Sequence, residues 1–207
     1  MHRVRSLHAL APAAWLTVLS LAACGDRDRA EVARDTAPVA GPETGMTADT
    51  TPAAAPLTDA NIVALLDEAN MADSAAGALA STKATNKAVK DFARLMMSEH
   101  HALRKQGQQL ATKLNVTPAP PANDPIKPLA QNEKAALEST PKGAEFDRVY
   151  IEQEITAHKA VLDLAENAQG QAQNEQLKAL IEQAKPVIQK HLDQAEKIKD
   201  ELGEATT

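Results

Sequence analysis

The stretch NKAVKDFARLMMSEHHALRKQGQQLATKL, residues 86–114, decides the fold class of this 207-residue chain. Its apolar and small residues recur in steps of three and four, which is the spacing of one face of an α-helix. The members of this stripe are Val89, Phe92, Met96, Leu103, Gly107, Leu110 and Leu114. His100 falls on the same stripe. The spacing therefore predicts an amphipathic helix over 86–114 that carries a histidine on its buried side.

Three more stretches have the same periodicity, over 59–83, 141–168 and 174–202. No run of alternating apolar residues and no hairpin turn indicates a strand. The proline-rich segment NVTPAPPANDP, residues 115–125, cannot continue a helix and separates the second helix from the third. We therefore predict an all-α fold: an up-down antiparallel four-helix bundle over 57–203 with a Pro-rich crossover.

Two details of the crossover are less determined by the pattern. The segment LAQNEKAALEST, residues 129–140, has the composition of a short additional helix. Thr140 followed by Pro141 is typical of a helix start, with the proline in the first turn. The third long helix is therefore expected to begin at Pro141.

The first residues of the chain predict export and a lipid anchor. Arg3 and Arg5 precede a short apolar run, which is typical of a secretory signal over 1–23. The tetrapeptide Leu21-Ala22-Ala23-Cys24 resembles a bacterial lipobox, in which the thiol of Cys24 is acylated and anchors the protein. Gly25 then favours sorting to the outer membrane, where the domain would face the periplasm. The segment 24–56 is rich in Pro, Ala and Thr and is predicted to be a disordered tether, and 204–207 a tail.

Charge and motifs exclude several classes of function. The chain has a formal net charge of −6, which disfavours binding to nucleic acid because phosphate contacts need Lys and Arg. No nucleophile elbow, phosphate loop or zinc-protease motif occurs. We therefore expect no enzyme activity, and no feature identifies a protein partner.

Four polar residues, Asp73, His100, His158 and His191, lie on the apolar stripes near the middle of their helices. In an antiparallel bundle such positions face the axis at similar heights, so they are candidates for one buried layer. Imidazoles with a carboxylate can bind zinc, copper or iron. Glu154 lies one turn before His158 and is a fifth ligand or a partner of that imidazole.

Two alternatives to a metal site remain open at this point. Ferritin-like di-iron sites need Glu-x-x-His, but Met97, Ile155 and Ile188 stand three residues before the histidines, which argues against a ferritin-type redox enzyme. The same polar layer could instead be a hydrogen-bonded network that sets helix register.

Three stretches together resemble the domain of unknown function 4142 family: NKAVKDFARLMMSEH (86–100), GAEFDRVYIEQEITAHKAVL (143–162) and IEQAKPVIQKHLDQA (181–195). The resemblance extends from Leu57 to Leu202 and implies a ferritin-like, exported protein without an established activity. The family's acid-histidine pair in the second helix is matched by Glu99-His100. In the third helix the acid is replaced by Ala157.

Two functional hypotheses follow. The first is a lipid-anchored, non-enzymatic interaction or structural module of the cell envelope. The alternative is a periplasmic bundle that binds a transition metal through the His/Asp layer.

Overall fold

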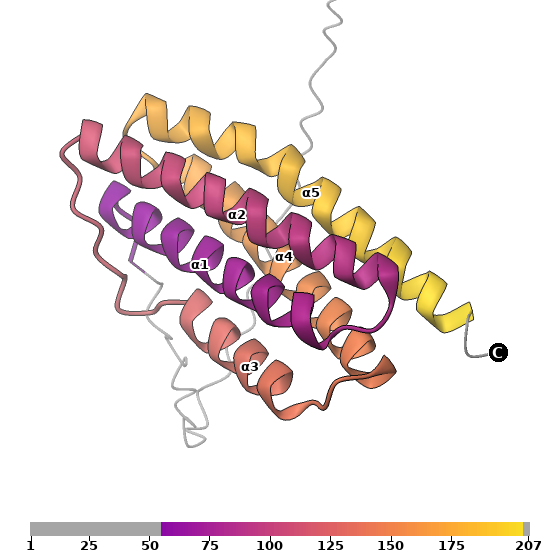
Figure 1. The fold of residues 1–207 in the computed structure, drawn as a ribbon. Helices are drawn as coiled ribbons and strands as arrows, with labels where there is room; N and C mark the ends of the chain where they lie inside the picture. Colours follow the sequence, from indigo (N-terminus) through magenta and orange to yellow (C-terminus); the bar gives the residue numbers. More distant parts are fainter. Residues whose placement is uncertain (1–54, 205–207) are drawn as a thin grey trace, which may run out of the picture. The chain divides into compact units, whose positions relative to one another are not determined.

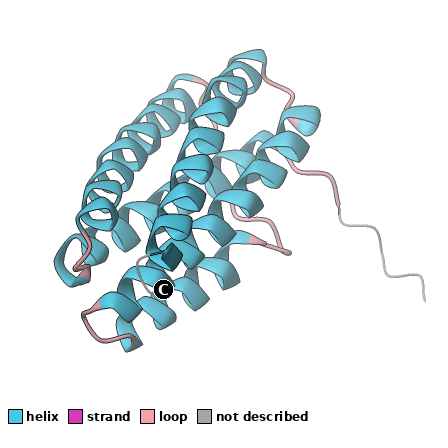
Figure 2. Cartoon of the chain, turned by 90° about the vertical axis from the view of Figure 1, so that its right-hand side faces the viewer, coloured by secondary structure: helices cyan, strands magenta, loops and turns pink. Residues whose placement is uncertain are grey.

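A computed structural model describes residues 55–204. This part of the chain contains five α-helices and no strand (Figure 1, Figure 2). The helices are α1 (Asp59–Lys83), α2 (Lys87–Lys113), α3 (Ile126–Ser139), α4 (Ala144–Gln171) and α5 (Glu175–Glu204). The all-α class is confirmed for these residues, and none of the five helices is long and apolar enough to cross a bilayer. The predicted signal peptide, the lipidation of Cys24, most of the tether and the end of the tail lie outside the described residues.

Side-chain caps explain where three of the helices begin. Thr58 caps α1: its hydroxyl accepts a hydrogen bond from the Asn61 backbone N–H, and the Asn61 side chain reciprocates. Asn86 accepts from two backbone N–H groups in the first turn of α2, and Asn174 does the same for α5. These residues fix three of the helix starts within one residue of the predicted positions.

The start of α4 differs from the prediction. Thr140 does not open this helix; it ends α3, where its hydroxyl donates to the Ala136 carbonyl at 2.7 Å. Gly143 has a φ of +149°, a conformation that side chains rarely adopt, and α4 begins only at Ala144. The glycine therefore sets the start of α4, and Pro141 lies in the preceding turn.

Contacts between helix ends fix the directions of the four long helices. Asp59, at the start of α1, accepts hydrogen bonds from the backbone of Gln173 and Asn174, just after α4. Lys113, at the end of α2, donates to Gln176, at the start of α5, at 2.8 Å. The pairs α1/α2, α4/α5, α1/α4 and α2/α5 are therefore antiparallel, while α2 and α4 run in the same direction.

The short helix α3 explains that parallel pair. It lies alongside α1 and α4 (Figure 1) and returns the chain along the length of the bundle. At its end, Lys83 of α1 donates to the carbonyl of Leu137 at 2.7 Å. The short additional helix suggested by residues 129–140 is therefore present as α3, and it packs against the bundle, so the described residues form five helices and not the expected four alternating ones.

The apolar core is divided into two clusters. One contains Phe92, Phe146 and Tyr150 and lies toward the α1/α2 connection; the other contains Ile62 and Leu177 and lies toward the α4/α5 connection. Each of the four long helices contributes one of the predicted polar residues, and these residues lie between the two apolar clusters. These residues, Asp73, His100, His158 and His191, are each at most 3% exposed.

Helices α1 and α2 approach each other closely at Gly77. A Cβ added there would lie 2.6 Å from the backbone oxygen of Ala93 and 2.9 Å from the backbone nitrogen of Met97. Only glycine permits this contact without moving α2. Gly77 lies one turn from Asp73 on α1, so the same close approach also sets the distance between Asp73 and His100 of α2.

Candidate metal centre

Three histidines from three helices meet in the polar layer: His100 of α2, His158 of α4 and His191 of α5. Their ring centroids are 5.5, 5.3 and 5.4 Å apart in pairs, which is a nearly equilateral triangle. Each side chain lies on the inward stripe of its helix, because the 3.6-residue period places it in phase with the apolar residues above and below.

His100 is held from the α1 side. Its Nδ1 is 3.0 Å from Oδ1 of Asn70 and 3.3 Å from Oδ2 of Asp73. Asp73 therefore lies behind the imidazole, at the ring nitrogen that already has a partner. Within the polar layer it supports His100 through this contact.

The other two imidazoles are held in the same way. His158 Nδ1 is 2.8 Å from the backbone oxygen of Glu154, and the Glu154 carboxylate is 3.4 Å from the same nitrogen. His191 Nε2 is 2.6 Å from Oε2 of Glu99. Each of the three rings thus has one nitrogen fixed by an oxygen acceptor.

The remaining nitrogens have no hydrogen-bond partner among the described residues: Nε2 of His100, Nε2 of His158 and Nδ1 of His191. Because an oxygen acceptor requires the proton on the fixed nitrogen, each free nitrogen carries a lone pair. The three histidines can each supply one ligand atom such that all three lie within 4.8 Å of one another. Tetrahedral binding at about 2.0–2.1 Å needs nitrogens about 3.3 Å apart, so a modest contraction would close the site.

The pKa values favour neutral imidazoles, the form that binds metals. Burial lowers the pKa of His100, although the charge of Asp73 opposes the shift. Burial also lowers the pKa of His191 to about 4, although the hydrogen bond that its ring donates to Glu99 opposes the shift. Both rings are therefore in the neutral form at neutral pH, with one N–H each.

Three partners of the site were missed by the sequence analysis: Asn70, Glu99 and Glu133. Glu99 is one residue away from the buried stripe of α2, and its side chain, one-third exposed, reaches across to α5. A carboxylate adjacent to a stripe histidine was visible in the sequence, but which neighbouring helix it faces depends on the packing. Glu133 lies on α3, a helix that periodicity alone did not establish.

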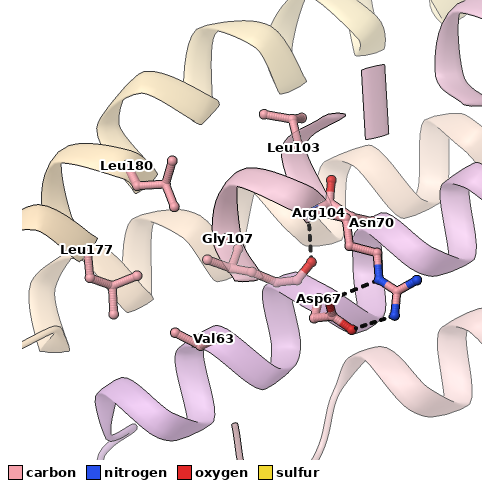
Figure 3. Close-up of a pocket in the computed structure, with 9 residues that line it drawn as sticks. Val63, Asp67, Asn70, Leu103, Arg104, Gly107, Leu177 and Leu180 are labelled. Atoms are coloured by element: carbon pink, nitrogen blue, oxygen red, sulfur yellow. Dashed lines mark hydrogen bonds and ion pairs between the residues drawn. The ribbon is translucent and has the colours of Figure 1, made fainter. Parts of the chain in front are cut away.

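Small hollows adjoin the centre on the side of α1, α2 and α5. One of about 40 Å³ is lined by Asp73 and His100, and another of about 20 Å³ is lined by Asn70. Figure 3 shows the second hollow with the Asp67–Arg104 ion pair beside it, where Arg104 Nε is 2.9 Å from Oδ1 of Asp67. These spaces give the imidazole cluster room for an ion or a water molecule and for small adjustments.

Glu133→Gln should stabilise the metal-free protein increasingly as the pH rises. Burial, and secondarily the charge of Asp73, raises the Glu133 pKa from 4.5 to about 8. Between these values the unfolded chain loses the proton while the folded protein keeps it, so stability falls as pH increases. Glutamine cannot ionise, so we expect the variant to exceed the parent by about 3 kcal/mol at pH 7 and by less than about 1 kcal/mol at pH 5.

Urea unfolding of chelator-treated protein at the two pH values measures this difference. Glu138→Gln, an exposed change on the same helix, is the control and should shift neither value. A gain that does not depend on pH would show that ionisation of Glu133 is not its cause.

Comparisons with known proteins agree with the helical architecture. Residues 44–198 match the family described as "Domain of unknown function (DUF4142)". The search of curated proteins found no match. A solved structure described as "CopM in the Cu(II)-bound form" is similar with a TM-score of 0.59 and 17% sequence identity. The alignment covers 71% of this chain and 99% of that chain, and at this identity it supports the fold alone.

Proposed function

The chain belongs to the family described as "Domain of unknown function (DUF4142)", and we propose that it binds a transition metal through His100, His158 and His191. The observation that carries this proposal is the arrangement of the free imidazole nitrogens. Three buried ring nitrogens have no partner, the three rings can supply ligand atoms within 4.8 Å of one another, and the other nitrogen of every ring is held by an oxygen. A purely structural polar layer would be expected to pair these nitrogens with one another or with nearby donors.

Copper is the metal we propose, with zinc as the second choice. Neutral imidazoles suit copper and zinc, and three nitrogens leave an open position for a water or a transferred ligand. The similar structure whose title names a Cu(II)-bound form supports copper as the first ion to test. The oxygens behind the rings would orient the imidazoles and raise their basicity.

The proposed role is the non-enzymatic binding and buffering of this metal in the cell envelope. The sequence Leu21-Ala22-Ala23-Cys24 supports attachment to the outer membrane through acyl chains, with the bundle facing the periplasm. A buried nitrogen site on a tethered domain would hold the ion away from reactive partners near the membrane.

Copper binding by histidine variants tests the proposal. The full-length chain in detergent is stripped with a chelator, loaded with Cu(II) and desalted, and bound copper is measured by mass spectrometry. We expect the parent to retain copper with nitrogen hyperfine splitting in its paramagnetic resonance spectrum. His100→Ala should weaken the affinity by about 100-fold or more, since it removes a ligand outright.

His101→Ala is the matched control, because His101 is the next residue and is exposed. This variant should bind copper like the parent. Equal copper retention and identical spectra for the two variants would contradict the site, and the polar layer would then be a register-setting network.

A further inference from the structure

A second group of buried polar side chains lies beside the imidazoles, on the side of α3. Asp73 of α1, Glu133 of α3 and Glu154 of α4 are 3%, 3% and 0% exposed. Asp73, Glu154 and His158 can each supply a ligand atom so that the three atoms lie within 4.8 Å of one another. Glu133 and Asp73 line the same small cavity, of about 10 Å³, which is enough for one water or one ion.

This acidic group lacks the partners that buried carboxyls normally have. Neither carboxylate oxygen of Glu154 has a hydrogen-bond partner among the described residues, and the same holds for Oε1 of Glu133. Such groups cost stability in a dry interior unless a proton, a donor or a cation satisfies them.

Tyr150 gives a second and independent indication of a ligand. Its side chain is fully buried, and its hydroxyl has no partner in the described structure. The hydroxyl lies beside the Glu154 carboxylate, but without the geometry of a full hydrogen bond. An unsatisfied oxygen therefore points into a group of unsatisfied carboxylates.

The electrostatics also favour an added positive charge. Asp73, Glu133 and Glu154 are three buried carboxyl groups from three helices. Among the described residues no Lys or Arg is buried, so no side-chain cation lies within this group. A divalent ion would replace the protons of these carboxyl groups and satisfy the free oxygens together.

An open groove leads to the acidic group. A hollow of about 500 Å³ lies between α1 and α3, and Glu133 is part of its lining. Glu68 and Glu138 lie along the same groove. Glu133 therefore adjoins a space large enough for a hydrated cation, although Lys127 and Lys134 line the same groove.

We propose that Asp73, Glu133 and Glu154, with the hydroxyl of Tyr150, form a second cation site that binds a hard divalent ion of the manganese(II) class. Carboxylate and hydroxyl oxygens suit this class, whereas copper and zinc favour imidazole nitrogens. The two sites adjoin within the polar layer: the first uses imidazole nitrogens, and the second uses carboxylate and hydroxyl oxygens, next to His158. The second site does not depend on copper binding by the histidines.

Manganese binding to the full-length chain tests this site. Free Mn(II) gives a sharp paramagnetic resonance signal that is lost on binding, so a titration with manganese chloride yields the number of sites and the affinity. We expect the parent to bind one Mn(II) and Glu133→Gln to bind it about tenfold more weakly or worse. His191→Ala should bind Mn(II) like the parent, because His191 is not among the oxygen ligands.

Misfolding cannot explain the expected loss, since chelator-treated Glu133→Gln should melt no lower than the parent at pH 7. Glu138→Gln serves as the surface control. Failure of the parent to bind Mn(II), or equal binding by Glu133→Gln, would overturn the proposal. Equal loss in Glu133→Gln and His191→Ala would also overturn it, because the two sets of residues would then form one site.

Discussion

His158→Ala is expected to abolish the rise in melting temperature that copper gives the parent protein. An ion that binds only the folded state stabilises it by about 2.7 kcal/mol at one hundred times the dissociation constant. For a domain of this size, that corresponds to a rise of about 5–10 °C. In the proposed site His158 supplies one of three nitrogens, and it is 1% exposed, so no side chain from the surface can take its place.

The comparison must use the shift on adding copper, not the absolute melting temperature. Alanine at this buried position leaves a cavity, so the metal-free variant will itself melt lower than the parent. Differential scanning calorimetry with and without Cu(II) separates the two effects for each protein. His101→Ala should keep the full shift, and a full shift in His158→Ala would argue against the imidazole site.

The histidine layer could be anticipated from the sequence because it depends on local periodicity. His100, His158 and His191 continue the stripes of their helices, and the caps at Thr58 and Asn86 fix where two helices begin. Once the long helices pack side by side, residues in the middle of each stripe meet. The approximate positions of four helices and of the buried histidines therefore follow from spacing alone.

The partners of the layer could not be anticipated, because they depend on how the helices are rotated and connected. Glu99 lies off the buried stripe, and its contact with His191 requires α2 and α5 to be neighbours. Glu133 is buried only because α3 docks on α1 and α4. The sequence predicted one layer of four residues. In the structure the three imidazoles lie together, while Asp73 contacts the ring of His100 and Glu154 contacts the ring of His158.

Gly77→Leu is expected to cost about 4 kcal/mol of unfolding free energy, at the upper end for a single substitution. A side chain at this position would meet the backbone oxygen of Ala93 and the backbone nitrogen of Met97. Backbone atoms cannot turn aside as a flexible side chain can, so α1 and α2 would have to separate. The loss of packing would outweigh the gain of about 1 kcal/mol that replacing glycine usually brings in a helix interior.

Gly107→Leu is the matched control, since this glycine is also inside a helix but a Cβ there meets nothing within 4 Å. Urea unfolding should show a small gain for the control and a large loss for Gly77→Leu. The loss should extend to function: separation of α1 from α2 would draw Asp73 away from His100, whose Nδ1 it approaches to 3.3 Å. Copper affinity should therefore fall in Gly77→Leu even at temperatures where the variant remains folded. Parent-like stability and affinity would show that the helices adjust without cost and that their close approach does not position the imidazole.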